Sequence, residues 1–154
     1  MADTHFTGPV LSGDLITGQT SGPNQGYVQL TQATTLTQNG TSAVSSTLYI
    51  PAGSTIQNFL IDVLTAHNSG TSDTLSAGIT AGGTQYVSGV SMQTAGRISP
   101  TFTGAQLGAM SGQSIVGVAA ATTAPVVITA TPVGTTATAG YTNVTVVYTQ
   151  LTSS

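Results

Sequence analysis

Short runs of β-branched and aromatic residues follow one another from Tyr27 onward, and glycine, proline or asparagine stands between them. Apolar and polar residues alternate within several of these runs, as they do in strands that bury one face. The candidates are Tyr27–Thr37, Leu48–Ile50, Thr55–Thr65, Leu75–Ile79, Pro125–Thr131 and Tyr141–Leu151, and weaker ones are Tyr86–Val90, Arg97–Phe102 and Ser114–Val118. About eight to ten strands in a chain of this length predict an all-β fold, an antiparallel two-sheet sandwich that is jelly-roll-like.

The first part of the chain has a different character, because glycine–proline pairs such as Gly8-Pro9 interrupt it and its pattern is weak. Such pairs end regular structure. We therefore predict an extended N-terminal arm over residues 1–25 and one β-sandwich domain over residues 26–154. The apolar residues of the arm would anchor it on a neighbouring surface, or would belong to a first edge strand. They include Phe6, Val10 and Leu11.

The most apolar candidate strand, Thr55–Thr65, has two interpretations. Side chains alternate along a strand, which would place Phe59, Ile61 and Val63 on one face and Leu60, Asp62 and Leu64 on the other. The apolar members of this run also fit the i, i+3, i+4 stripe of a helix. The β-rich surroundings and the absence of Lys and Glu favour the strand.

The chain carries almost no charge, which excludes several kinds of partner. It contains one Arg, no Lys, four Asp and no Glu, so charged residues make up 3% of it, against about 25% in ordinary globular proteins. Without a basic stripe it has no means to neutralise nucleic-acid phosphates or to dock on anionic lipid. No apolar stretch approaches the roughly 20 residues that cross a bilayer. We expect no nucleic acid and no membrane as partner, and synthesis in a cytoplasm, because no secretory signal pattern is visible.

Residues that could carry catalysis or hold a cofactor are few. His67 lies near Asp62 and Asp73 in the sequence, but the G-x-S-x-G context of a serine nucleophile is missing. We interpret His67 as a turn residue that hydrogen-bonds its own loop. The two His and four Asp show no metal-ligand spacing, and there is no Cys. The sequence therefore predicts a protein that is not an enzyme, with no catalytic residue, no cofactor and no metal site.

Arg97 is the one fixed cation of the chain. Its guanidinium would fork onto a carboxylate such as Asp62 or onto a partner subunit, or it would be a solvated residue after Gly96. A chain with so few ionisable groups is expected to work by contact between neutral surfaces. The candidate interface residues are Phe6, Val10, Leu11, Leu60, Leu64 and Arg97.

Three parts of the sequence carry a resemblance to a known family: the segment from Ile50 to Ile79, the run Tyr86–Gly96 and the ending Gly140–Gln150. They resemble small virion proteins of tailed bacteriophages. This resemblance implies a capsid decoration (cement) protein, commonly a trimer of β-sandwich subunits seated on the outside of an icosahedral head. The implied partners are further copies of the chain and the major capsid protein, and the implied location is the outer surface of the virion. The resemblance offers no catalytic residue to transfer.

Three other functions compete with this one. A fibre or head-surface module would bind a glycan or receptor by stacking it on exposed tyrosines, for which the candidates are Tyr27, Tyr49, Tyr86 and Tyr141. Thr-x-Thr pairs suggest an ice-binding surface, although their irregular spacing gives no repeating array. An enzyme ranks last, for want of a positioned acid, base or nucleophile.

Overall fold

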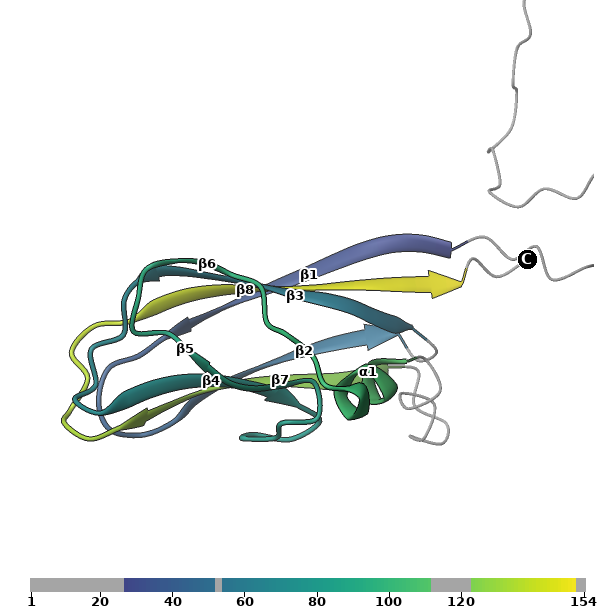
Figure 1. Ribbon diagram of the computed structural model, residues 1–154. Coiled ribbons are helices and arrows are strands. Elements are labelled where there is room, and N and C mark those ends of the chain that lie inside the picture. The colour runs from purple at the N-terminus through teal and green to yellow at the C-terminus, as the bar shows by residue number, and fades with distance from the viewer. Residues whose placement is uncertain (1–26, 52–53, 112–122, 152–154) are drawn as a thin grey trace, which may run out of the picture.

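The computed structural model describes residues 27–51, 54–111 and 123–151, which form eight strands and one short helix (Figure 1). The predicted arm with Phe6, Val10 and Leu11, and the candidate strand Ser114–Val118, lie outside the described residues. The elements are β1 (Tyr27–Thr37), β2 (Val44–Pro51), β3 (Thr55–Thr65), β4 (Ser72–Gly78), β5 (Val87–Ser91), β6 (Gly96–Ile98), α1 (Gly104–Met110), β7 (Thr123–Val133) and β8 (Tyr141–Leu151).

The strands form two four-stranded antiparallel sheets that pack face to face (Figure 1). Sheet 1 has the order β1-β8-β3-β6, and sheet 2 has the order β2-β7-β4-β5. The first strand pairs with the last, the second with the seventh, the third with the sixth and the fourth with the fifth. This is the pairing of a long hairpin rolled into a sandwich, which defines the jelly roll. The predicted all-β two-sheet fold is confirmed.

Three predicted strands match the structure at both ends, whereas Pro125–Thr131 was too short, because β7 spans Thr123–Val133. Tyr27–Thr37, Thr55–Thr65 and Tyr141–Leu151 have the predicted bounds in β1, β3 and β8. The helical interpretation of Thr55–Thr65 is wrong, because the run pairs with β8 on one side and β6 on the other. The candidate Arg97–Phe102 was too long, since β6 ends at Ile98.

The helix α1 was not predicted, and a capping box explains why it forms. The Thr103 hydroxyl accepts a hydrogen bond from the Gln106 backbone, and the Gln106 side chain accepts one from the Thr103 backbone N–H. Two N–H groups at the start of the helix are thus satisfied locally, which stabilises a short helix without a long apolar stripe. The helix has seven residues, and no helix in the described part of the chain is long and apolar enough to cross a membrane.

The core lies between the two sheets and consists mainly of every second residue of the long strands, and in β3 a register shift between Ile56 and Asn58 interrupts this alternation. Along β3 the inward residues Ile56, Phe59, Ile61 and Val63 are at most 3% exposed, while the residues between them are less buried. Sheet 2 supplies mainly small and β-branched side chains opposite them, including Leu75, Ala77, Val126, Ile128 and Ala130. The ring of Phe59 stacks on Tyr86, with centroids 6.3 Å apart. The apolar alternation seen in the sequence is therefore the alternation between core and surface.

The connections divide between the two ends of the sandwich (Figure 1). One end, here called the four-loop end, is made of residues 38–43, 66–71, 92–95 and 134–140. The other end carries α1 and the described chain termini. At the four-loop end Asn68 joins two loops, because its carbonyl accepts from the N–H groups of Thr138 and Ala139, and its amide donates to the Thr138 hydroxyl.

The core predicts a clear contrast between two leucines, Leu75 on β4 of sheet 2 and Leu64 on β3 of sheet 1. Leu75→Ala is expected to lower the free energy of unfolding by about 2–5 kcal/mol, because Leu75 is fully buried and its loss leaves a cavity. Leu64→Ala, at a residue that is 61% exposed, is expected to change it by less than about 0.5 kcal/mol. Urea unfolding of both variants measures the difference, and equal losses would contradict the inward and outward assignment.

Candidate functional site

The outward side of sheet 1 is a broad surface over which Figure 1 shows no described helix or strand, and we call it the sheet-1 face. It carries three of the predicted interface residues, namely Leu60, Leu64 and Arg97. The strand registers and the burial pattern assign to it Gln29, Thr31, Ala33, Thr35, Thr37, Asn58, Leu60, Asp62, Leu64, Arg97, Tyr141, Asn143, Thr145, Val147 and Thr149. Asp62 and Arg97 are the charged residues among them.

The centre of the sheet-1 face consists of apolar and hydroxyl-bearing side chains. Leu60 stands opposite Thr145, which stands opposite Ala33 on β1. Val147 is only 7% exposed although it points outward, and Thr31 and Asn58 stand on either side of it by register. Cross-strand neighbours on one face lie about 5 Å apart, so these side chains form a closed, nearly neutral layer.

Leu64 is the most exposed large apolar side chain that the structure describes, at 61%. A β-bulge causes this exposure: the register between β3 and β8 shifts between Val63 and Thr65, so that Leu64 is the extra residue. Next to it by register stands Tyr141, which is 37% exposed. The bulge therefore places a protruding leucine beside a tyrosine at the four-loop end of the sheet-1 face.

Arg97 forks onto Asp62 across the β3–β6 pair, which is the first of the three predicted alternatives. Its Nε lies 2.6 Å from Oδ1, and its Nη2 lies 3.0 Å from Oδ2. Hydrogen bonding and the nearby positive charge hold the pKa of Asp62 below its usual value, and the same contacts raise the pKa of Arg97. Because each charge compensates the other, the sheet-1 face has no net charge. The arginine side chain stays 66% exposed and accessible to a partner.

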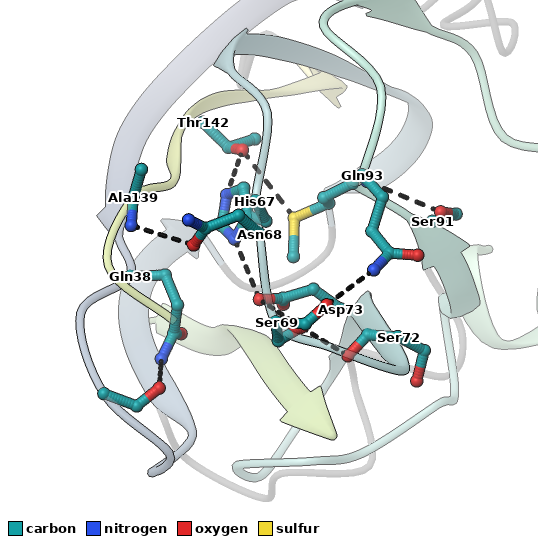
Figure 2. Close-up of polar contacts among 12 residues, drawn as sticks. Gln38, His67, Asn68, Ser69, Ser72, Asp73, Ser91, Gln93, Ala139 and Thr142 are labelled. Atoms are coloured by element: carbon teal, nitrogen blue, oxygen red, sulfur yellow. Dashed lines mark hydrogen bonds and ion pairs between the residues drawn. The ribbon is translucent and has the colours of Figure 1, made fainter. Parts of the chain in front are cut away.

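A second polar group lies inside the four-loop end and contains His67, which was expected to be a turn residue that hydrogen-bonds its own loop. His67, Asp73 and Thr142 come from the β3–β4 loop, from β4 and from β8, so they join one sheet to the other (Figure 2). Nε2 of His67 is 2.8 Å from the Thr142 hydroxyl, and Nδ1 is 3.3 Å from Oδ2 of Asp73. The side chains of His67 and Asp73 have no solvent exposure. The interpretation that His67 only hydrogen-bonds its own loop is wrong.

The surroundings of His67 leave it no room to move. A Cβ at Gly140 would stand 2.7 Å from Cγ and Nδ1 of the imidazole, so only glycine fits there without a shift. The backbone N–H of His67 donates to the carbonyl of Met92, and the N–H of Met92 donates to the carbonyl of Asp73. The Thr142 hydroxyl also lies 3.7 Å from the sulfur of Met92. Backbone and side chains thus fix this group together as a tie between the sheets.

The order hydroxyl, imidazole and carboxylate matches that of a hydrolase triad, but the setting cannot serve catalysis. A nucleophile must be reached by its substrate, and Thr142, His67 and Asp73 are each at most 2% exposed. The contact between Nδ1 and Oδ2 also lacks the alignment of a hydrogen bond that would orient the imidazole. We therefore assign the group a structural role. Among the described residues, no cluster of three or more His, Cys, Asp or Glu could hold a metal ion.

A shallow hollow of about 420 Å³ lies between the β4–β5 loop and α1. Its lining consists of Thr84, Gln85, Ser88, Thr103, Ala105, Gln106 and Ala109. No member of this lining titrates near neutral pH or is charged, so the hollow provides no acid, base or anion-binding group. It does not coincide with any residue that the sequence singled out for binding.

Of the tyrosines proposed for stacking on a glycan, the three whose side chains the structure describes do not gather on one surface. Tyr86 is 3% exposed, packs on Phe59, and has its pKa raised by burial, so its assignment as an exposed aromatic is wrong. Tyr49 is 60% exposed but lies on β2, in sheet 2, whereas Tyr141 lies on β8, in sheet 1. A stacking platform needs neighbouring rings, which these two do not provide.

Comparison with known proteins identifies no matching family model, curated protein or solved structure. The functional argument therefore rests on the geometry of the sheet-1 face and of the buried tie. The sequence predicted Leu60, Leu64 and Arg97 as interface residues, which stays a prediction; the structure places them on one face and adds Tyr141 as a neighbour of Leu64. The alternation within β8 pointed to its outward side, but only the register of β8 against β3 places it beside Leu64.

The buried tie predicts strong coupling between His67 and Asp73. Asp73→Ala is expected to lower the free energy of unfolding by about 3–5 kcal/mol, because it leaves the sealed imidazole without its carboxylate. The double variant His67→Leu/Asp73→Val is expected to recover most of that loss, since apolar side chains need no partner there. Denaturant unfolding measures both, with Asp62→Ala at the exposed ion pair as the control that changes stability little. Additive losses in the double variant would contradict the tie.

Proposed function

We propose that this chain is a non-catalytic structural protein of a virion, a capsid decoration protein that binds the outer surface of a bacteriophage head and stabilises the shell. The observation that supports this most is the sheet-1 face, a broad neutral surface with a protruding Leu64 and a self-compensated ion pair. The proposed contact is packing against the shell protein. The proposed location is the capsid exterior, and the protein binds there as a homo-oligomer.

The rigid fold and the nearly neutral surface of the described chain suit a decoration protein. It must bind many identical sites, and a rigid sandwich presents the same surface at each of them. The single described histidine is sealed in the core, and the Asp62 and Arg97 charges are already paired, so the surface offers little for acid–base chemistry. Its apolar and hydroxyl groups suit contacts with an apolar centre and a polar rim.

A glycan- or receptor-binding module of a fibre or head surface is the alternative. Exposed Tyr49 and Tyr141 would have to act separately in it, since they belong to different sheets. That separation favours attachment to a shell over stacking on a sugar.

Purified particles test the proposed function directly. The protein is expected in heads of the phage that carries its gene, at a copy number set by the symmetry of the shell, and electron cryo-microscopy is expected to place it outside the capsid. Its absence from purified particles, or its presence only in the tail fibres, would reject the decoration role.

The binding surface is tested by two matched exposed residues. Leu64→Asp is expected to weaken binding to heads that lack the protein by about 30-fold, equivalent to about 2 kcal/mol, if Leu64 is a contact in the apolar centre. Val133→Asp is the control, because Val133 is 49% exposed but lies in sheet 2. Occupancy against protein concentration gives both affinities. Equal weakening by the two substitutions would reject the sheet-1 face as the contact.

Attachment is expected to survive about 1 M salt, at which exposed charges are screened beyond about 3 Å. Packed apolar contacts and backbone hydrogen bonds are little affected by screening, and the ion pair of the face is internal to the chain. Sedimentation of particles after a high-salt wash measures the retained protein. Release by salt alone would show that charge attraction holds it on the head.

A further inference from the structure

Strand β1 forms one border of sheet 1 and pairs with a single neighbour (Figure 1). It pairs with β8 over its whole length of 11 residues without a shift in register. Within the described residues no strand pairs with its other side. An edge of this kind presents a row of backbone N–H and C=O groups that can accept a further strand.

The three other edge strands carry features that discourage such pairing, and β1 carries none. β6 has three residues and contains Arg97. β5 has an irregular register against β4 and contains Gly89 at a φ of 64°. β2 ends at Pro51, which has no N–H to donate. The sequence of β1, YVQLTQATTLT, contains no charged residue, glycine or proline. Length, regularity and neutrality together make it the edge best suited to association.

The inward side of β1 also leaves apolar area exposed. Val28 and Leu30 are 40% and 37% exposed, whereas Leu36 on the same side of the strand is 1% exposed. The opposite sheet therefore covers one half of the strand and leaves the other half partly open. A strand added at this edge would lie beside the two exposed residues and reduce their contact with water.

We propose that β1 pairs antiparallel with β1 of a second copy around a two-fold axis near Gln32, the middle residue of the strand. Sheet 1 of one subunit and sheet 1 of the other then form one continuous sheet. In this register Thr31 stands opposite Ala33 of the partner subunit, and Val28 stands opposite Leu36 of the partner subunit. Several like charges on the strand would repel those of its copy in this register, and β1 has no charge.

The proposed strand pair supplies about as many backbone hydrogen bonds as a stable protein interface contains. In an antiparallel pair alternate residue pairs exchange two hydrogen bonds, so a strand of 11 residues supplies about ten across the axis. Protein interfaces carry on average about ten direct hydrogen bonds. Two-fold pairing is also the commonest closed symmetry, and it buries both copies of the edge at once. The self-paired unit is a dimer, in place of the trimer that the family resemblance implies.

Charge substitution on β1 tests this pairing with the free full-length protein, independently of any binding to a phage head. Thr31 and Ala33 are exposed on the outward side, so charges there leave the core intact. The wild type is expected to be a dimer by analytical ultracentrifugation. Thr31→Lys/Ala33→Lys and Thr31→Asp/Ala33→Asp are each expected to raise the dimer dissociation constant at least ten-fold, because like charges then face one another.

An equal mixture of the lysine and aspartate variants is expected to form a heterodimer, because each lysine then faces an aspartate. This recovery separates loss of pairing from loss of folding, and circular dichroism of each variant is expected to match the wild type. A wild-type protein that is monomeric or trimeric would overturn the proposal. Variants that keep the wild-type mass, or a mixture that does not associate, would overturn it as well.

Discussion

The packing of two sheets through their inward residues is the interaction on which the rest of the structure depends. Each long strand gives every second side chain to a core of small and β-branched residues, with Phe59 as its largest fully buried member. The backbone is satisfied by antiparallel ladders, in which the first half of the chain pairs with the second half. A chain that is 3% charged can remain folded in this way, because neither the core nor the ladders require ionised groups.

The Asp, Arg and His residues of the described chain lie in two pairs, and the positions of these pairs give them different roles. Asp62 and Arg97 compensate each other on the surface, where such a pair contributes little stability but leaves the sheet-1 face neutral. His67 and Asp73 lie in the core and hold the β3–β4 loop against β4, while the Thr142 contact reaches β8. These three residues are arranged like a catalytic triad, but solvent cannot reach them, and their role is to hold the two sheets together.

Neutral surfaces suit the proposed function. Many copies of a decoration protein must bind one particle, and uncharged contacts make that binding independent of the salt concentration. The sheet-1 face and the free side of β1 are different surfaces of the same sheet, one formed by side chains and the other by backbone groups. The proposed head contact uses the first, and the proposed self-pairing uses the second. A dimer joined through β1 would therefore present two sheet-1 faces side by side in one continuous sheet.

The sequence by itself determined the fold class, the bounds of β1, β3 and β8, and the side of β3 that carries Leu60 and Leu64, because alternation along a strand is a local property. It missed α1, although the Thr103 and Gln106 spacing of a capping box was visible. Only the tertiary structure decided that Arg97 meets Asp62, that Tyr141 stands beside Leu64, and that His67 is buried against Asp73 and Thr142. These contacts join residues from different strands and loops, and the register between strands is set by the packing of the whole core.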